Sequence, residues 1–345
     1  MKKLVLAGIL LTAFGWAQQR PRLVGLSHIA VRVKDLNAAR HFYGDLLGYQ
    51  EAFTIRKDQT AVVNGGLSQD QVSAVFFKVN NRQYIVVMPE TSPEQPRYVD
   101  TAIETDNAEG MRTFLKSMGY AVPDKVEKTP TFDLAFHIKD PDGNSYEIMQ
   151  YTPESLSVQT FGKFLNDDRA STRILHVGIS ISKQETADFY LKDFLLREFW
   201  RADPTMTAPG RARPTPTSGP VLASLSNLKL PEADDYIEWS LVHARPADAA
   251  PANNAGNGGR GAGGPAVGGG HIALLVPDMA KAVVFVKAKA AWKDYARAAQ
   301  QESHVGVNHK WQGNFFDPDG TRTEFMEADT ADGLPSPMSH APYFQ

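Results

Sequence analysis

The feature that most constrains the fold of this chain is a pattern that occurs twice. A histidine lies inside a short apolar segment, and far downstream an Asp-Pro-Asp-Gly sequence is followed by a glutamate four residues after its glycine. The first copy comprises His28 in segment 27–31, turn 140–143 and Glu147; the second comprises His176 in segment 175–179, turn 317–320 and Glu324. Two copies at this spacing indicate a duplicated supersecondary unit.

The segments between these landmarks alternate between strand and helix periodicity. Each half of the chain contains two units in which a strand precedes a helix and further strands follow it. In the first half we expect strands at 24–33, 74–79, 83–88 and 98–105 and helices at 38–47 and 108–118. In the second half we expect strands at 175–181, 236–242 and 271–276 and helices at 186–199 and 282–290, and the segment 315–327, which contains the second turn, completes the last unit.

The N-terminus has the features of a secretory signal peptide. Basic residues at 2–3 precede an apolar run at 4–14 and a small-residue ending at Ala17, after which we expect cleavage. The apolar run is shorter than the roughly 20 residues that cross a bilayer. The chain contains no cysteine, which suits an oxidising compartment and leaves stability to the apolar core. We therefore expect a periplasmic or extracellular protein that is not embedded in a membrane after cleavage.

The charge balance argues against polyanionic partners. The formal net charge is −3, so the chain offers no basic surface for nucleic acid or for an anionic membrane. A small molecule is therefore the expected substrate or ligand. Two segments, 203–220 and 246–270, are too rich in Pro, Gly, Ala, Asn and Thr to bury apolar area, so we expect loops there.

Four side chains in the second half are candidate metal ligands: His176, Glu238, His271 and Glu324. Residues 175, 177, 179 and 181 are apolar and share one strand face, which leaves His176 on the other; Glu238 and His271 are likewise out of phase with their apolar neighbours. Two imidazoles and two carboxylates facing one cleft would suit a divalent ion such as Fe, Ni, Zn, Mn or Co. Without a cation, the two carboxylates would repel each other.

These motifs resemble the vicinal oxygen chelate superfamily, which includes glyoxalase I, extradiol dioxygenases and the bleomycin resistance proteins. The resemblance rests on the His-Ile-Ala-Val strand with its Phe-Tyr helix and on the Asp-Pro-Asp-Gly turn leading to glutamate. It implies an α+β fold of tandem domains, each built of paired βαβββ modules that form a curved mixed sheet around a cleft. Together with the composition, the resemblance divides the chain into a signal peptide at 1–17, two domains at 22–153 and 173–330, a linker at 154–172, a low-complexity insert at 246–270 within the second domain and a tail at 331–345.

The resemblance assigns the metal site to the second domain. In the first domain, Val86 occupies the place of Glu238 and Asp100 the place of His271, although His28 and Glu147 remain. The implied metal site of the first domain is therefore degenerate, as in two-domain extradiol dioxygenases. Whether His28, Asp100 and Glu147 bind a metal stays open. Two domains within one chain can pack against each other, as two single-domain chains do in a dimer. The resemblance is therefore also compatible with a monomer.

Several activities remain open. With all four ligands, Glu324 or Glu238 could leave the ion and act as the catalytic proton carrier in glyoxalase-like or epimerase-like chemistry. With only His176, His271 and Glu324 bound, the set suits Fe(II) and oxygen activation, as in an extradiol dioxygenase. The alternative is a metal-free protein that sequesters a small molecule, of the bleomycin resistance type.

Other polar and aromatic residues have structural explanations. The aspartates of both Asp-Pro-Asp-Gly sequences are expected to be turn residues, because proline fixes one backbone angle and glycine accepts positive φ. We expect His309 to lie in a solvated loop. Tyr236 and Trp239 are expected in the core and at its rim, without contact to a cofactor.

Overall fold

The computed structural model describes residues 19–212, 220–243, 270–295 and 303–345. The expected signal peptide and nearly all of the low-complexity insert lie outside these residues, as does part of the 203–220 loop. Within the described ranges, no helix is both long and apolar enough to cross a membrane.

The first half of the chain forms a nine-stranded mixed sheet with strand order β3-β2-β4-β5-β1-β6-β9-β8-β7. The strands are β1 (Leu23–Val33), β2 (Gln50–Arg56), β3 (Ala61–Val63), β4 (Val72–Lys78), β5 (Tyr84–Pro89), β6 (Tyr98–Thr105), β7 (Glu127–Lys128), β8 (Leu134–Lys139) and β9 (Ser145–Gln150). The helices are α1 (Leu36–Arg40), its π-helical continuation η1 (His41–Leu46), α2 (Ala108–Ser117) and α3 (Leu156–Gln159).

The second half repeats this arrangement in an eight-stranded sheet of order β11-β12-β13-β10-β14-β17-β16-β15. The strands are β10 (Ile174–Ile181), β11 (Arg197–Ala202), β12 (Leu225–Lys229), β13 (Tyr236–Leu241), β14 (His271–Leu275), β15 (His304–Val305), β16 (Lys310–Phe316) and β17 (Arg322–Thr330). The helices are α4 (Gln184–Asp188) with its π-helical continuation η2 (Phe189–Asp193), α5 (Met279–Ala288) and the 3-10 helix η3 (Ala290–Asp294). Two curved mixed sheets with few helices confirm the expected α+β fold.

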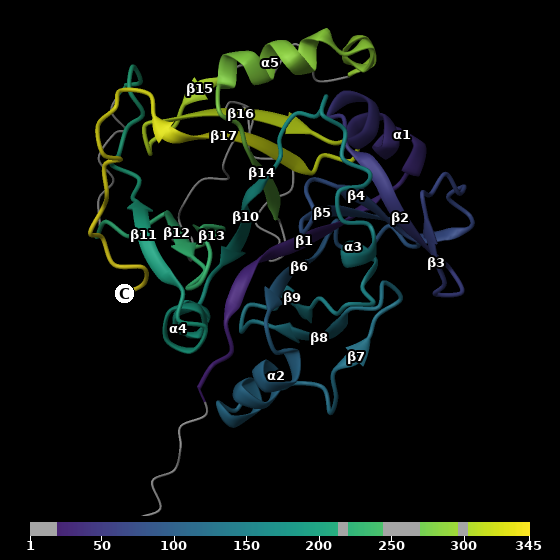
Figure 1. The fold of residues 1–345 in the computed structure, drawn as a ribbon. Coiled ribbons are helices and arrows are strands. Elements are labelled where there is room, and N and C mark those ends of the chain that lie inside the picture. The colour runs from purple at the N-terminus through teal and green to yellow at the C-terminus, as the bar shows by residue number, and fades with distance from the viewer. Residues whose placement is uncertain (1–18, 213–219, 244–269, 296–302) are drawn as a thin grey trace, which may run out of the picture.

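Equivalent strands pair in the same way in both sheets. β1 is parallel to β5 and antiparallel to β6, and β10 is parallel to β13 and antiparallel to β14. Figure 1 shows β1 and β10 next to each other where the two sheets meet, and these strands are in contact. The apolar faces of both sheets contribute to one continuous core cluster, which contains Ile29 and Val31 of β1 together with Val177 and Ile179 of β10.

Reciprocal hydrogen bonds connect each Asp-Pro-Asp-Gly turn to the opposite half of the chain. Tyr43 on η1 donates to Asp317, and Tyr190 on η2 donates to Asp140. Asp142 accepts from the backbone N–H groups of Ser182 and Lys183, just before α4. The glycines of the turns have φ angles of 93° and 96°, as expected for a turn. The turn aspartates are therefore structural, and they also join the two sheets.

Two details of the expected secondary structure were wrong. The helix expected at 186–199 ends at Asp193, because Leu195 has a φ of 58° and the chain then enters β11. Leu175 does not share the core face with Val177. The pairing register of β10 shifts between Ile174 and His176, so Ile174 enters the main core and Leu175 packs instead with Tyr236 and Met326.

Candidate metal centre

The four predicted ligands lie on four strands that are adjacent in the sheet: Glu238 on β13, His176 on β10, His271 on β14 and Glu324 on β17. Gly178 of β10 lies opposite both Glu238 on β13 and His271 on β14, and Ala273 lies opposite Glu324 on β17. In the first sheet Ala30 lies opposite Val86 and Asp100, and Ala102 lies opposite Glu147. By strand register, Val86 is therefore equivalent to Glu238, Asp100 to His271 and Glu147 to Glu324. These are the equivalences expected from the sequence.

The imidazole and carboxylate heads of the second sheet converge. The Nε2 atoms of His176 and His271 are 3.0 Å apart. Glu324 places Oε2 3.5 Å from the first and 3.3 Å from the second of these nitrogens. The Glu238 carboxylate is somewhat farther away, at 4.0 Å from His176 and 3.7 Å from His271. One ligand atom from each of His176, Glu238 and His271 falls in a group in which all separations are within 4.8 Å.

All four side chains are buried, with exposed fractions of 8% or less. Oε2 of Glu324 faces both imidazoles. Burial of a carboxylate is costly unless hydrogen bonds or a cation compensate its charge. This donor set, with two nitrogens and carboxylate oxygens at separations that one ion can span, fits a divalent metal.

The close approach of β14 to β10 depends on a glycine. A Cβ atom at position 178 would overlap the His271 ring, so only glycine leaves room for this imidazole over the strand. Gly178 therefore sets the position of a candidate ligand although it offers no ligand atom itself.

A positively charged side chain borders the site. Nη2 of Arg322 lies 2.7 Å from Nδ1 of His271 and 3.8 Å from Oε2 of Glu324. Burial and the Arg322 guanidinium lower the pKa of His271 to about 3. Burial opposes ionisation of Glu324, but the guanidinium and the two histidines still hold its pKa well below the usual value. In the absence of a cation the site therefore contains a neutral His271 and an ionised Glu324.

Two further residues contact the ligands. With its amide nitrogen turned toward Glu238, Asn227 on β12 donates to Oε2 of Glu238 over 3.2 Å. The ring of Tyr236 stacks on His176 with centroids 4.5 Å apart. Burial, together with the neighbouring Glu238 and Glu324 carboxylates, raises the pKa of Tyr236 well above its usual value. Tyr236 is buried as expected and also packs against the candidate ligand His176, and Trp239 lies in the core as expected.

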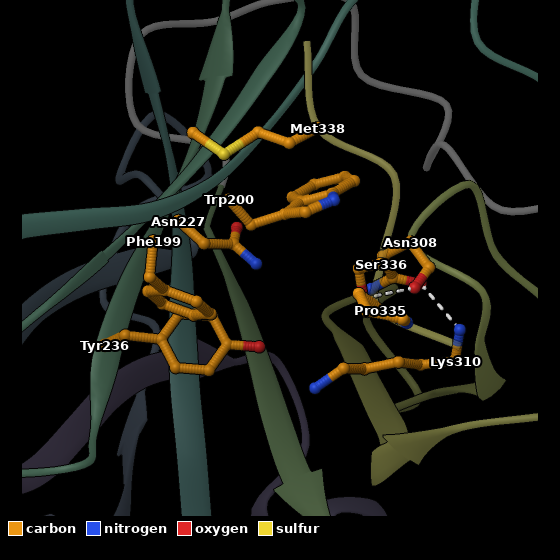
Figure 2. A pocket seen from close by; sticks show the side chains of 9 residues that line it. All are labelled: Phe199, Trp200, Asn227, Tyr236, Asn308, Lys310, Pro335, Ser336 and Met338. Atoms are coloured by element: carbon orange, nitrogen blue, oxygen red, sulfur yellow. Dashed lines mark hydrogen bonds between the residues drawn. The ribbon is translucent and has the colours of Figure 1, made fainter. Parts of the chain in front are cut away.

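A cavity of about 260 Å³ adjoins these residues. Figure 2 shows aromatic rings on one side of it and the Lys310 side chain extending into it from the other. Residues from the expected tail at 331–345 complete its wall, and Trp200 donates to the carbonyl of Pro337 in that tail. The lining residues are Phe199, Trp200, Asn227, Tyr236, Asn308, Lys310, Pro335, Ser336 and Met338.

Sequence reasoning missed several of these residues. Arg322 was detectable, because it precedes Glu324 by two positions and so shares its strand face. Asn227 and the residues of the tail carried no such pattern. His309 lies in a turn as expected, but it is not free in solvent, since its Nδ1 lies 2.8 Å from a carboxylate oxygen of Asp332.

Comparisons with known proteins agree with this architecture. Residues 25–148 match the family model described as the Glyoxalase/Bleomycin resistance protein/Dioxygenase superfamily. No curated protein matches the sequence.

Solved structures resemble the chain over nearly its full length. A Mn(II)-bound glyoxalase from Novosphingobium aromaticivorans is 15% identical with a TM-score of 0.58, covering 94% of this chain and 87% of that one. An extradiol ring-cleaving dioxygenase from B. fuscum is 13% identical with a TM-score of 0.60, covering 95% and 77%. The 2,3-dioxygenase LapB from Pseudomonas sp. KL28 is 13% identical with a TM-score of 0.59, covering 94% and 98%. At these identities the likeness concerns the fold.

Proposed function

We propose that the chain belongs to the glyoxalase/bleomycin resistance protein/dioxygenase superfamily and that its second domain is a divalent-metal-dependent enzyme, because residues 25–148 match that family's model and the second sheet repeats the fold of the first. Its substrate is a small molecule with adjacent oxygens. The observation that carries this proposal is the convergence of His176, His271 and Glu324, whose Nε2 and Oε2 atoms lie 3.0 to 3.5 Å from one another. Glu238 completes the set.

A divalent ion held by these residues would supply Lewis acidity to the substrate oxygens. Glu324 contacts both imidazoles and is the more deeply buried carboxylate, so it is the permanent anionic ligand. Glu238 lies farther from both histidines and is hydrogen-bonded to Asn227, which also lines the cavity. Glu238 is therefore the carboxylate placed to accept and return a substrate proton, with Asn227 orienting its Oε2 atom.

The cavity indicates the kind of substrate. Phe199, Trp200 and Tyr236 provide flat apolar walls, and the Lys310 ammonium group lies across from them. A substrate with a planar or apolar body and a negatively charged substituent is complementary to both sides. Such a body would lie against the Tyr236 ring, which itself stacks on His176.

Proton transfer of the glyoxalase or epimerase type is the reaction that this arrangement supports best. Such a reaction needs a carboxylate in addition to the permanent ligand Glu324, and Glu238 provides it. Extradiol oxygenation is the second candidate. The observation that favours it is the greater distance of Glu238 from the histidines, which would leave a set of two histidines and one carboxylate.

Elemental analysis of purified protein incubated separately with Fe(II), Ni(II), Zn(II) and Mn(II) tests the proposal. We expect a stoichiometric ion that Glu324→Gln abolishes. We expect Glu238→Gln to retain the ion but to lose turnover of a hemithioacetal or another substrate with an acidic C–H bond. Turnover of a catechol by Glu238→Gln with Fe(II) would instead support oxygenation. Absence of a stoichiometric ion under all conditions would overturn the proposal in favour of small-molecule sequestration.

We also propose that the protein is exported and monomeric. The basic, apolar and small-residue succession at the N-terminus supports export. The hydrogen bonds of Tyr43 and Tyr190 across the two halves support a monomer, since one chain supplies both sides of the domain interface. Cell fractionation with N-terminal sequencing tests the first statement, and light scattering coupled to gel filtration tests the second. Detection of an uncleaved cytoplasmic protein, or of a stable dimer, would contradict them.

A further inference from the structure

A set of aromatic side chains lies on the face of the first sheet that is opposite to the main core. Phe76 on β4 and Tyr84 on β5 alternate along their strands with residues of the main core, and both pack with Phe53 on β2. The ring centroid of Phe53 lies 4.6 Å from that of Phe76 and 5.2 Å from that of Tyr84. These three rings, with Ala30 and Val86 of the same apolar cluster, form what we call the aromatic face.

The aromatic face corresponds to a wall of the cavity in the second sheet. Tyr84 lies opposite His28 in the register of β1 and β5. Tyr236 lies opposite His176 in the register of β10 and β13, so the two tyrosines occupy equivalent positions. Tyr236 lines the cavity of about 260 Å³. The aromatic face is therefore the part of the first domain where an equivalent cavity would lie.

Part of the expected linker covers the aromatic face. Leu156 in α3 and Phe164 both pack against this cluster. The backbone N–H of Leu156 donates to the carbonyl of Thr131 over 2.9 Å, and that of Gly162 donates to Oδ1 of Asn81 over 2.7 Å. Figure 1 shows α3 beside the strands of the first sheet. Apolar contacts and hydrogen bonds together hold this part of the linker in place.

A buried lysine on the same face also binds the linker. Lys78 shares a strand face with Phe76, is fully buried, and places Nζ 6.0 Å from the centre of the Tyr84 ring. Nζ donates to the carbonyl of Thr160 in the linker over 2.7 Å. A buried ammonium group needs partners that replace its hydration, and the linker supplies one. Burial also lowers the pKa of Lys78 to about 8.

The linker and the tail are equivalent segments that pack differently. The linker follows β9 and the tail follows β17, and each of these strands is the last of its sheet along the chain. Pro335, Ser336 and Met338 of the tail line the cavity and leave space beside Tyr236. In the first domain, linker side chains pack directly on the aromatic face. The chain thus supplies its own apolar group at the position where the second domain has room for a molecule.

We propose that residues 152–165 are a built-in occupant of the first domain, which keeps the aromatic face closed to small apolar molecules. Displacement of this segment would expose an aromatic binding site. The proposal concerns the first domain alone, so it does not depend on the metal centre or the reaction proposed above. The segment also offers a matched control, because Leu156 and Phe164 pack on the rings whereas Val158 and Phe161 are 44% and 69% exposed.

Titration of the full-length protein with N-phenyl-1-naphthylamine, a neutral aromatic dye that fluoresces in apolar surroundings, tests the proposal. We expect the double variant Leu156→Ser, Phe164→Ser to bind one equivalent more than the wild type. The milder variant Leu156→Ala is expected to show the same gain with lower affinity. The control Val158→Ser, Phe161→Ser is expected to bind as the wild type does. Any dye bound in the second domain contributes equally to all four proteins, so the difference reports the first domain.

An added tryptophan locates the additional dye. Residues 19–153 contain no tryptophan, so Phe76→Trp adds a fluorophore on the aromatic face. The dye is expected to quench its emission more strongly in the Leu156→Ser, Phe164→Ser background than in the wild-type or control background. Equal quenching in all three would overturn the proposal, because the face would then be open without displacement. The proposal is also refuted if the double variant and Leu156→Ala, both folded by circular dichroism, bind no additional dye.

Discussion

Nη2 of Arg322 lies 2.7 Å from Nδ1 of His271, on the side of the imidazole that faces away from the candidate metal position. A guanidinium group is always a donor, so in this arrangement Nδ1 accepts and the His271 proton resides on Nε2. Coordination through Nε2 requires the opposite tautomer, with the proton on Nδ1. Arg322 therefore opposes metal binding through both its charge and its hydrogen bond.

Replacement of Arg322 by Gln is expected to strengthen metal binding about tenfold or more. It removes a positive charge 3.8 Å from Glu324, and about 1.4 kcal/mol corresponds to a factor of ten in affinity. Competition with a chromophoric chelator measures the change. Arg112→Gln, at an ion pair with Glu109 in the first domain, serves as the control. Weaker binding in Arg322→Gln would show that the guanidinium supports the site.

Gly178→Ala is expected to abolish metal binding in the second domain while the protein stays folded. The added methyl group would overlap the His271 ring and displace its Nε2 atom from the other donors. Ser180→Ala, two residues along the same strand, is the matched control and is expected to bind normally. Elemental analysis measures the metal content, and circular dichroism shows whether the protein is folded. A Gly178→Ala protein with full metal content would mean that His271 is not a required ligand.

Tyr43→Phe and Tyr190→Phe are each expected to destabilise the protein by about 1–3 kcal/mol. Each substitution removes a donor from a buried turn aspartate, Asp317 or Asp140, that lies in the other half of the chain. Urea unfolding monitored by tryptophan fluorescence measures the loss. Because the two halves share one core cluster, we expect a single transition in both variants. An unchanged midpoint in both would show that these hydrogen bonds do not hold the halves together.

The metal-free protein is expected to lose stability as the pH falls from about 6.5 toward 3. His271 has a folded pKa of about 3, below its value of 6.5 in an unfolded chain, so the unfolded state binds more protons in this window. The free energy of unfolding then decreases with falling pH, by at most about 1.4 kcal/mol per pH unit from this group. The contribution is fully present above pH 6.5.

Urea titrations of chelator-treated protein at several pH values between 7 and 4 provide the measurement. His271→Asn lacks the ionisable group and is expected to show a shallower pH dependence than the wild type. Identical slopes in the two proteins would indicate that His271 is not held neutral by burial and Arg322.

Much of the fold follows from local patterns. The alternation around Glu238 and His271 placed Ile237 and Ile272 in the core, because side chains of a strand point alternately to its two faces. The glycines of both Asp-Pro-Asp-Gly turns adopt positive φ, which their position after proline and aspartate predicts. Where a local irregularity intervened, the prediction failed. The register shift before His176 and the positive φ of Leu195 have no simple sequence pattern.

The sequence by itself determined the duplicated units, the strand faces and the four side chains that meet in the second domain, because each depends on periodicity or turn chemistry over a few residues. Only the tertiary structure decided what surrounds them. Three contacts show this: that of Arg322 with His271, the hydrogen bond of Asn227 to Glu238, and the part of the cavity wall that Met338 forms. The residues that each contact joins are separated along the chain by distances that range from 11 to more than 100 positions. Such contacts depend on how the sheets curve and on where the chain end packs, which are properties of the whole core.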